Sequence, residues 1–185
     1  QFRQKFQQFK EVKEIPLPKH FKGELRPYQK AGYNWFHFLK EFSFGGCLAD
    51  EMGLGKTVQV LVLLLKEKEN GNKNHSLVIV PTSLIFNWQQ EVKKFTPSLK
   101  IYLYYGPDRK KNFNSIKKEK YDFILTTYGI LKNDIEILKE EKFNYIILDE
   151  SQNIKNPITQ GAKCAYSLKA HHKLALTGTP IENNT

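Results

Sequence analysis

Short apolar runs separated by helix-like segments recur along most of the chain. The predicted strands are GCLA (46–49), LVIV (77–80), IYLYY (101–105), DFILTT (122–127), YIILD (145–149) and LALTG (174–178). Strands without polar alternation are buried on both faces, and their alternation with helices is typical of a parallel sheet. The sequence therefore predicts an α/β fold, with a mostly parallel central sheet and helices on both faces.

Two of the predicted helices can be bounded from the sequence. Residues 56–68 form a helical run after the first predicted strand. Thr82 or Ser83 is expected to cap a second helix that ends at Phe95, because these side chains accept hydrogen bonds from N–H groups at a helix start. Most other segments between the strands are helix-like and rich in Lys and Glu, as expected for helices that cover a sheet.

The N-terminal segment differs from the rest of the chain. Phenylalanines at helical spacing within residues 1–13 predict an amphipathic helix, and two prolines follow it. We therefore expect residues 1–20 to be a helix and a Pro-containing linker, and residues 21–185 to be the folded lobe. Because the chain does not start with Met, we also expect it to be a piece of a longer protein.

The composition favours a folded domain with an anionic partner. The chain has 185 residues, of which 40% are hydrophobic, and this is enough for one domain with a sizeable core. Its net charge of +10 favours nucleic acid, although a Lys-rich solvated surface is the alternative. No apolar run approaches the roughly 20 residues of a membrane span. Cys47 and Cys164 lack metal-ligand spacing, so we expect reduced thiols and no disulfide partner.

The stretch LADEMGLGKT has the context of a phosphate-binding loop, because it follows a predicted strand and opens a predicted helix. The general motif is G-x-x-x-x-G-K followed by Ser or Thr. The end of the stretch fits this motif, but Asp50 stands where the first glycine is expected. On its own, the match is also compatible with a glycine turn before a helix.

The chemistry of this loop suits a nucleotide. Gly53 and Gly55 allow backbone N–H groups to turn toward phosphate oxygens, and the positive end of the helix dipole faces the same anion. We expect Lys56 to reach the β- and γ-phosphates of ATP and Thr57 to hold magnesium. These are the roles that the Lys and the hydroxyl have in such loops.

A pair of carboxylates follows a later strand. Asp149 and Glu150 come directly after the apolar run YIIL, which is the Walker B arrangement. Asp149 is expected to bind magnesium and Glu150 to orient or deprotonate the attacking water. An acidic pair that caps a surface turn is the alternative for this motif alone. Two motifs in the right order, each at a strand end, indicate nucleotide hydrolysis.

Read together, six segments resemble the SWI/SNF family of helicase-superfamily-two ATPases over about residues 20–185. They are LRPYQKAGYNW (25–35), LADEMGLGKT (48–57), LVIVPTSLIFNWQQE (77–91), ILTTYGIL (124–131), ILDESQNIKNP (147–157) and LALTGTPIENN (174–184). The family's own phosphate loop reads DEMGLGKT, so the resemblance implies that Asp50 is a family feature. It also implies a RecA-like P-loop lobe, the first of two, in an ATP-driven translocase on double-stranded DNA.

The resemblance assigns roles to matching residues. Gln29 would read the adenine edge of ATP, and the resemblance implies that the nucleotide-binding loop comprises Asp50, Met52, Gly53, Leu54, Gly55, Lys56 and Thr57. The segment that couples hydrolysis to nucleic-acid binding would comprise Thr177, Gly178 and Thr179. Contacts to a nucleic-acid backbone would come from Pro81, Thr82, Ser83, Thr126, Thr127 and Tyr128. For Gln29, a solvent-exposed position at a helix start is the alternative.

One position departs from the family's usual Asp-Glu-Ala-His quartet. Here the quartet reads Asp149-Glu150-Ser151-Gln152, so Gln152 replaces a His that links to the Thr177 segment. Gln donates and accepts hydrogen bonds but does not titrate near neutral pH. We therefore expect hydrolysis to persist, with altered coupling as an open alternative. A DNA-binding scaffold with a decayed ATPase, and an RNA or single-strand helicase, are the competing functions.

The family's second RecA-like lobe, which supplies arginine fingers, lies outside this chain, so the fragment alone is expected to hydrolyse ATP very slowly. We expect Trp35 and Trp88 to be core residues, and His171 and His172 to be surface residues before a strand. The Lys-rich segment 109–120 could follow a phosphate backbone or form a solvated face. Abundant Lys, Asn and Ile favour a bacterial, cytoplasmic protein, whereas a eukaryotic one would be nuclear.

Overall fold

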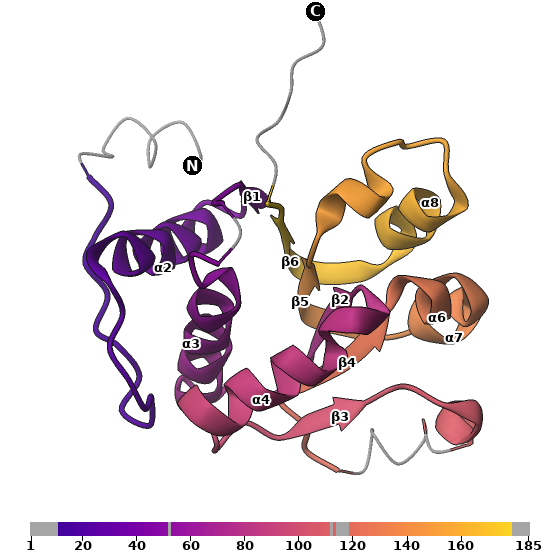
Figure 1. Ribbon diagram of the computed structural model, residues 1–185, viewed down its shortest axis with the longest axis horizontal. Helices are drawn as coiled ribbons and strands as arrows, with labels where there is room; N and C mark the ends of the chain where they lie inside the picture. The colour runs from indigo at the N-terminus through magenta and orange to yellow at the C-terminus, as the bar shows by residue number, and fades with distance from the viewer. Residues whose placement is uncertain (1–10, 52, 112, 114–118, 179–185) are drawn as a thin grey trace, which may run out of the picture.

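The computed structural model describes residues 11–51, 53–111, 113 and 119–178. Its centre is one six-stranded sheet in the order β1-β6-β5-β2-β4-β3, in which every pair of neighbours is parallel. The strands are β1 (Gly46–Leu48), β2 (Ser76–Val80), β3 (Ile101–Leu103), β4 (Phe123–Thr127), β5 (Lys142–Leu148) and β6 (Lys169–Leu176). The predicted parallel α/β sheet is confirmed (Figure 1).

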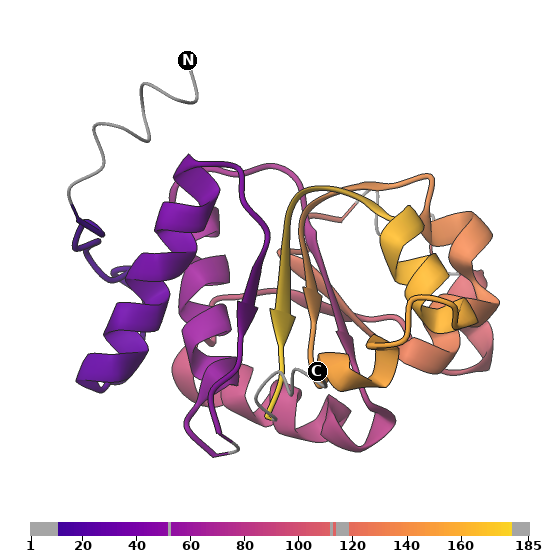
Figure 2. The ribbon, with the colours of Figure 1, turned by 90° about the horizontal axis from the view of Figure 1, so that it is seen from above.

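Helices cover both faces of this sheet (Figure 2). One face carries α2 (Pro27–Glu41), α3 (Lys56–Glu69) and α4 (Ile85–Phe95), and the other carries α6 (Tyr128–Asn133), α7 (Ile135–Leu138) and α8 (Gln160–Ser167). Short 3-10 turns are η1 (Thr82–Leu84), η2 (Pro107–Lys110) and η3 (Ser151–Ile154). This two-sided cover explains why the strands are apolar on both faces.

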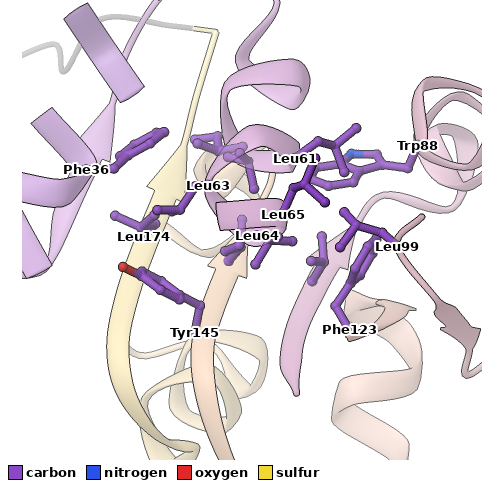
Figure 3. Close-up of a cluster of buried hydrophobic side chains, with 14 of the residues drawn as sticks. Phe36, Leu61, Leu63, Leu64, Leu65, Trp88, Leu99, Phe123, Tyr145 and Leu174 are labelled. Carbon is purple, nitrogen blue, oxygen red and sulfur yellow. The ribbon is translucent and has the colours of Figure 1, made fainter. Parts of the chain in front are cut away.

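The helix that follows the phosphate-binding loop is the centre of the larger core. Leu61, Leu63 and Leu65 of α3 are completely buried, between the sheet and the flanking helices α2 and α4 (Figure 3). Each such leucine contributes about 1.5–3 kcal/mol through burial. The start of α3, where phosphate is expected, is therefore fixed by the best-packed helix of the lobe.

Two strands begin earlier than the sequence predicted. β5 and β6 pair from Lys142 and Lys169 onward, so the ladder extends over residues that are mostly polar and do not form an apolar run. His171 and His172 consequently lie inside β6, and the prediction that they precede the strand is wrong. Pairing with the neighbouring strand, rather than side-chain polarity, decides where these strands begin.

The predicted cap of α4 is also wrong. Thr82 and Ser83 belong to η1, and α4 begins only after Leu84, which makes no side-chain cap hydrogen bond. The turn is closed instead by the backbone, with Leu84 N–H donating to the carbonyl of Pro81 at 2.9 Å. This backbone hydrogen bond stands at the start of the helix in place of a side-chain cap.

The tryptophan predictions are confirmed. Trp88 is 0% exposed, and Trp35 lies partly buried against the same core. Both cysteine thiols are free. Within the described ranges, no helix is long and apolar enough to cross a membrane.

The segment before α2 is anchored on the lobe. Ile15 and Leu17 pack against α2 and α3, and Glu69 at the end of α3 accepts hydrogen bonds from the N–H groups of Lys19 and His20, each at 2.9 Å. Most of the helix that was expected in residues 1–13 lies outside the described residues. The part of the expected linker that is described is thus tied to the fold at several points.

Candidate nucleotide and nucleic-acid site

The strand order gathers the predicted residues along one edge of the sheet. The phosphate-binding loop follows β1, Thr177 follows β6, and Asp149 follows β5, and these three strands are neighbours. Pro81 follows β2 and Tyr128 follows β4, on the other side of β5. Ligands of parallel α/β sheets bind at the carboxyl ends of the strands. The expected nucleotide half and the expected nucleic-acid half therefore meet at Asp149.

The loop between β1 and α3 has the backbone that phosphate binding needs. Gly53 has φ 83° and Gly55 has φ 79°, both in the left-handed region that disfavours side chains. A Cβ at Gly53 would meet nothing within 4 Å, whereas a Cβ at Gly55 would lie 2.4 Å from Nε2 of Gln29. Met52, which was also assigned to the loop, lies outside the described residues. A side chain at Gly55 would therefore displace the Gln29 amide, in addition to the strain of its positive φ.

Lys56 is the first residue of α3 and points back into the loop. Its ammonium donates to the carbonyl oxygens of Asp50 at 2.7 Å and Glu51 at 3.1 Å, and the residue is 8% exposed. Thr57 follows in the first turn of the same helix, where unpaired N–H groups and the helix dipole favour an anion. The loop therefore surrounds a buried cation at the position where phosphate would bind.

Gln29 joins the start of α2 to the loop. Its Oε1 accepts a hydrogen bond from Arg26 N–H at 2.9 Å, and its Nε2 donates to the carbonyl of Leu54 at 3.0 Å. With 8% of its surface exposed, Gln29 is not the solvent-exposed glutamine that was the alternative to adenine contact. Each end of the amide keeps one further hydrogen-bonding position, which a base edge could use.

Asp149 is a buried carboxylate held by several donors. It is 5% exposed, and its Oδ2 accepts from Trp88 Nε1 at 2.8 Å while its Oδ1 accepts from Glu150 N–H at 2.9 Å. Burial raises the pKa of Asp149, although both hydrogen bonds and the nearby Lys56 charge favour the ionised form. The hydroxyl of Tyr128 donates to the Asp149 carbonyl at 2.6 Å.

The contact with Trp88 was missed by sequence reasoning. The residue reads as an apolar position on a helix, and its partner is 61 positions away. A general signal was available, since the indole N–H of a buried Trp usually finds a hydrogen-bond acceptor. That rule indicates a partner for Trp88 but does not identify it.

Gln152 connects the second carboxylate to the end of β6. Its Nε2 donates to the Glu150 carboxylate, and its Oε1 accepts from Thr177 Oγ1 at 2.9 Å. The N–H of Thr177 in turn donates to the carbonyl of Leu48, which lies at the end of β1. The glutamine thus occupies the linking position that the sequence assigned to it. Gly178 is partly exposed, and Thr179 lies outside the described residues.

Glu150 itself has an unusual backbone. Its φ of 49° places it in the left-handed region, where a non-glycine residue is uncommon. The conformation is held by the η3 turn, in which Asn153 N–H donates to the Glu150 carbonyl at 3.0 Å. Such backbone strain concentrates at functional sites, and here the Glu150 carboxylate accepts a hydrogen bond from Gln152.

The residues expected to contact a nucleic acid differ in accessibility. Thr82 and Ser83 are exposed and Pro81 is partly exposed. Thr126 is fully buried, with its hydroxyl donating to the Tyr104 carbonyl at 2.9 Å. Thr127 is 3% exposed, and its hydroxyl accepts from Ile130 N–H at the start of α6. The threonine hydroxyls at the end of β4 therefore bond within the protein.

The Lys-rich segment 109–120 is partly committed to the fold. Arg109 Nε lies 2.6 Å from Oδ2 of Asp134, and Lys110 Nζ lies 2.9 Å from Oδ1 of the same carboxylate. Burial opposes ionisation of Asp134, but these cations and the Tyr104 hydroxyl hold its pKa below the usual value. Residues 114–118 lie outside the described residues, so the two alternatives for that part of the segment stay open.

The sequence of the chain matches the model of a known protein family. Residues 28–185 match the SNF2-related domain. The chain belongs to the SNF2-related domain family. This confirms the resemblance that the sequence segments indicated.

Two relatives show how this SNF2-related domain compares in length. YwqA of Bacillus subtilis is 48% identical over 174 residues, which cover 90% of this chain and 19% of YwqA. Helicase swr1 of Schizosaccharomyces pombe is 43% identical over 176 residues, which cover 92% of this chain and 14% of swr1. The chain therefore spans less than a fifth of the length of these relatives.

A solved structure shares the fold of this SNF2-related domain. The SWI2/SNF2 ATPase core of Sulfolobus solfataricus in complex with dsDNA superposes with a TM-score of 0.84 at 45% identity. The match covers 93% of this chain and 35% of that chain. The lobe described here is therefore the RecA-like lobe of such a core.

Proposed function

We propose that this SNF2-related domain is the ATP-binding and ATP-hydrolysing lobe of a motor that moves along double-stranded DNA. The observation that carries the proposal is the convergence of the phosphate-binding loop, Asp149, Glu150 and Thr177 at one edge of the sheet. The similar SWI2/SNF2 core was solved in complex with dsDNA, and helicase swr1 is among the relatives. Both support the same activity for the longer protein.

ATP binding follows from the loop. Lys56 would exchange its bonds with the Asp50 and Glu51 carbonyls for phosphate oxygens, which are stronger acceptors because they are charged. The space beside Gly53, where an added Cβ would meet nothing within 4 Å, would let a phosphate approach the backbone, and the α3 N-terminus favours its negative charge. Gln29 would use its remaining hydrogen-bonding positions for the adenine edge.

The residues present also fit a magnesium ion. Thr57 and Asp149 would hold it, because hydroxyl and carboxylate oxygens are the ligand types that magnesium prefers. When bound, the ion would neutralise charge that develops on the phosphates. The hydrogen bonds of Asp149 to Trp88 and to Glu150 N–H keep its carboxylate in one orientation.

Glu150 would act on the attacking water, and Gln152 would connect Glu150 to Thr177. The Glu150 carboxylate orients or deprotonates the water, and the Gln152 amide fixes that carboxylate relative to Thr177. A hydrogen-bonding link of this kind does not require a titrating side chain. The presence of Gln in place of His is thus compatible with hydrolysis, and a decayed ATPase gains no support from it.

Contact with duplex DNA would use the segments after β2 and β4. Pro81, Thr82 and Ser83 offer exposed hydroxyls and N–H groups at the start of the η1 turn. At the end of β4, the buried hydroxyls of Thr126 and Thr127 would shape the segment, and the partly exposed Tyr128 would follow them. The net charge of +10 suits contact with the phosphate backbone.

Completion of the motor would require a second RecA-like lobe in the same longer chain, which supplies arginine to the γ-phosphate. The two relatives, which are several times longer than this chain, leave room for it. They come from a bacterium and a fungus, so a cytoplasmic protein if bacterial, or a nuclear one if eukaryotic, remains the expectation.

The proposal is tested by Glu150→Gln in the full-length protein, assayed for ATP hydrolysis with duplex DNA. Loss of the water-orienting carboxylate is expected to lower kcat by about 100-fold or more while ATP still binds. Glu136→Gln, on a carboxylate that is 77% exposed, is the matched control and should leave the rate unchanged. An unchanged rate for Glu150→Gln would contradict the mechanism.

A further inference from the structure

Asp149 accepts hydrogen bonds from two segments that lie on the expected nucleic-acid side of the sheet edge. Trp88 belongs to α4, which follows β2, and its indole N–H donates to the carboxylate at 2.8 Å. Tyr128 opens α6, which follows β4, and its hydroxyl donates to the main-chain carbonyl of Asp149 at 2.6 Å. One contact holds the side chain of Asp149 and the other holds its backbone.

The two faces of α4 meet different surroundings. Phe86 is 69% exposed, although it lies only two positions before the completely buried Trp88. Two residues of an α-helix are separated by about 200° around the axis, so these side chains point in nearly opposite directions. Phe86 is exposed, as are Thr82 and Ser83 of the preceding η1 turn. The face with Trp88 reaches the carboxylate.

The indole is also tightly enclosed. Its ring packs edge-on against Phe123 of β4, with centroids 6.4 Å apart, and it lies in the core beside α3 (Figure 3). Protein interiors are close-packed, so a shift of α4 cannot be absorbed by empty space around Trp88. A displacement of the exposed face of α4 would therefore move the donor that holds Asp149.

We propose that Trp88 and Tyr128 are positioning residues that link duplex contact to divalent-cation binding at Asp149. Residues that hold a metal ligand from behind strongly affect metal affinity. A contact with duplex on α4 or at Tyr128 would change the orientation of Asp149 and so the magnesium concentration that nucleotide binding requires. Linkage is reciprocal, so magnesium and ATP together would change duplex affinity by the same factor. This inference rests on the proposed function.

The test compares Trp88→Phe with the unchanged protein, both at full length. Phe keeps most of the buried ring but removes the N–H that Asp149 accepts. The measurement is the binding of a fluorescent ATP analogue across a range of magnesium concentrations, with and without duplex DNA. We expect the half-maximal magnesium concentration to rise about 10-fold in the variant without duplex. We also expect the shift that duplex causes in the unchanged protein to shrink.

Trp35→Phe is the matched control, because it makes the same chemical change in α2, on a partly buried ring that packs against Phe36. It should leave the magnesium dependence unchanged. Tyr128→Phe removes only one hydroxyl and is expected to reduce the duplex-induced shift in the same direction as Trp88→Phe. Replacing Trp88 by benzothienylalanine, which keeps the ring shape without the N–H, serves if the Phe variant does not fold.

Particular outcomes would overturn the inference. An unchanged magnesium midpoint in Trp88→Phe, or a lower hydrolysis rate with the same midpoint, would reduce Trp88 to a packing role. A raised midpoint with a duplex-induced shift of normal size would remove the link to duplex. If the unchanged protein shows no duplex-stimulated hydrolysis, the proposed function and the duplex link both fail. The comparison of Trp88→Phe with Trp35→Phe without duplex would still decide whether Trp88 positions Asp149.

Discussion

At the scale of single residues, the two loop glycines have the same backbone but different neighbours. Both lie in the left-handed region, yet only Gly55 faces a neighbour, with Gln29 Nε2 2.4 Å from the position of an added Cβ. Gly53→Ala should therefore add only the strain of a side chain at positive φ, about 1–2 kcal/mol. Gly55→Ala should add the same strain and also displace Gln29. We expect the ATP affinity of Gly55→Ala to be at least 10-fold lower than that of Gly53→Ala, as measured by fluorescent nucleotide titration. Equal losses in the two variants would contradict this account of the loop.

His37 makes the stability of the lobe depend on pH. Burial lowers the pKa of His37 to about 4, against an opposing contribution from Glu67 and together with the repulsion of Lys40 and Lys66. In the unfolded chain His37 is protonated below about pH 6.5, whereas in the folded chain it is protonated only below about pH 4. The contribution of neutral His37 to the unfolding free energy is therefore present above pH 6.5 and is lost as the pH falls to 4.

The check is urea unfolding of the 185-residue chain at several pH values, for the unchanged sequence and His37→Gln. The difference in unfolding free energy between the two should fall as pH decreases from 6.5 to 4. The variant keeps the contribution of His172, whose pKa is also lowered by burial. A difference that does not depend on pH would show that His37 titrates normally.

Local motifs predicted the candidate site residues best. The phosphate-binding loop is recognised from Gly55, Lys56 and Thr57 after one strand, and the carboxylate pair from Asp149 and Glu150 after another. The Trp88 contact and the burial of the Thr126 hydroxyl could not be predicted from local sequence. Both depend on partners that the sheet brings together from distant positions.

At the scale of elements, a buried charged cluster fixes the η2 turn to the junction of α6 and α7. Asp134 is 2% exposed and pairs with Arg109 and Lys110 while accepting from Tyr104 at 3.0 Å. Asp134→Asn would leave cations without their carboxylate and should reduce the unfolding free energy by about 3 kcal/mol. Asp108→Asn is the control, since this carboxylate is 66% exposed, and should change it by less than about 0.5 kcal/mol.

Urea unfolding of both variants measures the difference. Similar values for Asp134→Asn and Asp108→Asn would show that the cluster does not stabilise the lobe. A large loss of unfolding free energy in Asp134→Asn would also indicate that Arg109 and Lys110 stabilise the fold. Contact with a nucleic-acid backbone would then come from other residues.

Element types were predictable, whereas several element boundaries were not. The apolar runs located all six strands of the described sheet, most clearly β2 and β4, which are buried at every residue. The early starts of β5 and β6 depend on pairing between Lys142 and Lys169, which composition does not reveal. The backbone-closed η1 turn and the anchoring of Lys19 and His20 on Glu69 likewise depend on geometry outside the local sequence.

At the scale of the whole molecule, the sheet order separates two functions along one edge. β1, β6 and β5 supply the expected nucleotide contacts, and β2 and β4 supply the expected nucleic-acid contacts. Asp149, which directly follows β5 of the first group, is held by Trp88 and Tyr128 of the second group. This arrangement could be expected from strand-end motifs in general, but which strands are neighbours was visible only in the structure.

If this lobe belongs to a motor driven by duplex DNA, ATP hydrolysis should depend on the polymer that is present. The measurement is ATP hydrolysis by the full-length protein without nucleic acid, with single-stranded DNA, with duplex DNA and with duplex RNA. We expect strong stimulation by duplex DNA and little by the other polymers. Stimulation by RNA or single strands would place the protein among other helicases of the superfamily, and no hydrolysis under any condition would contradict the claim.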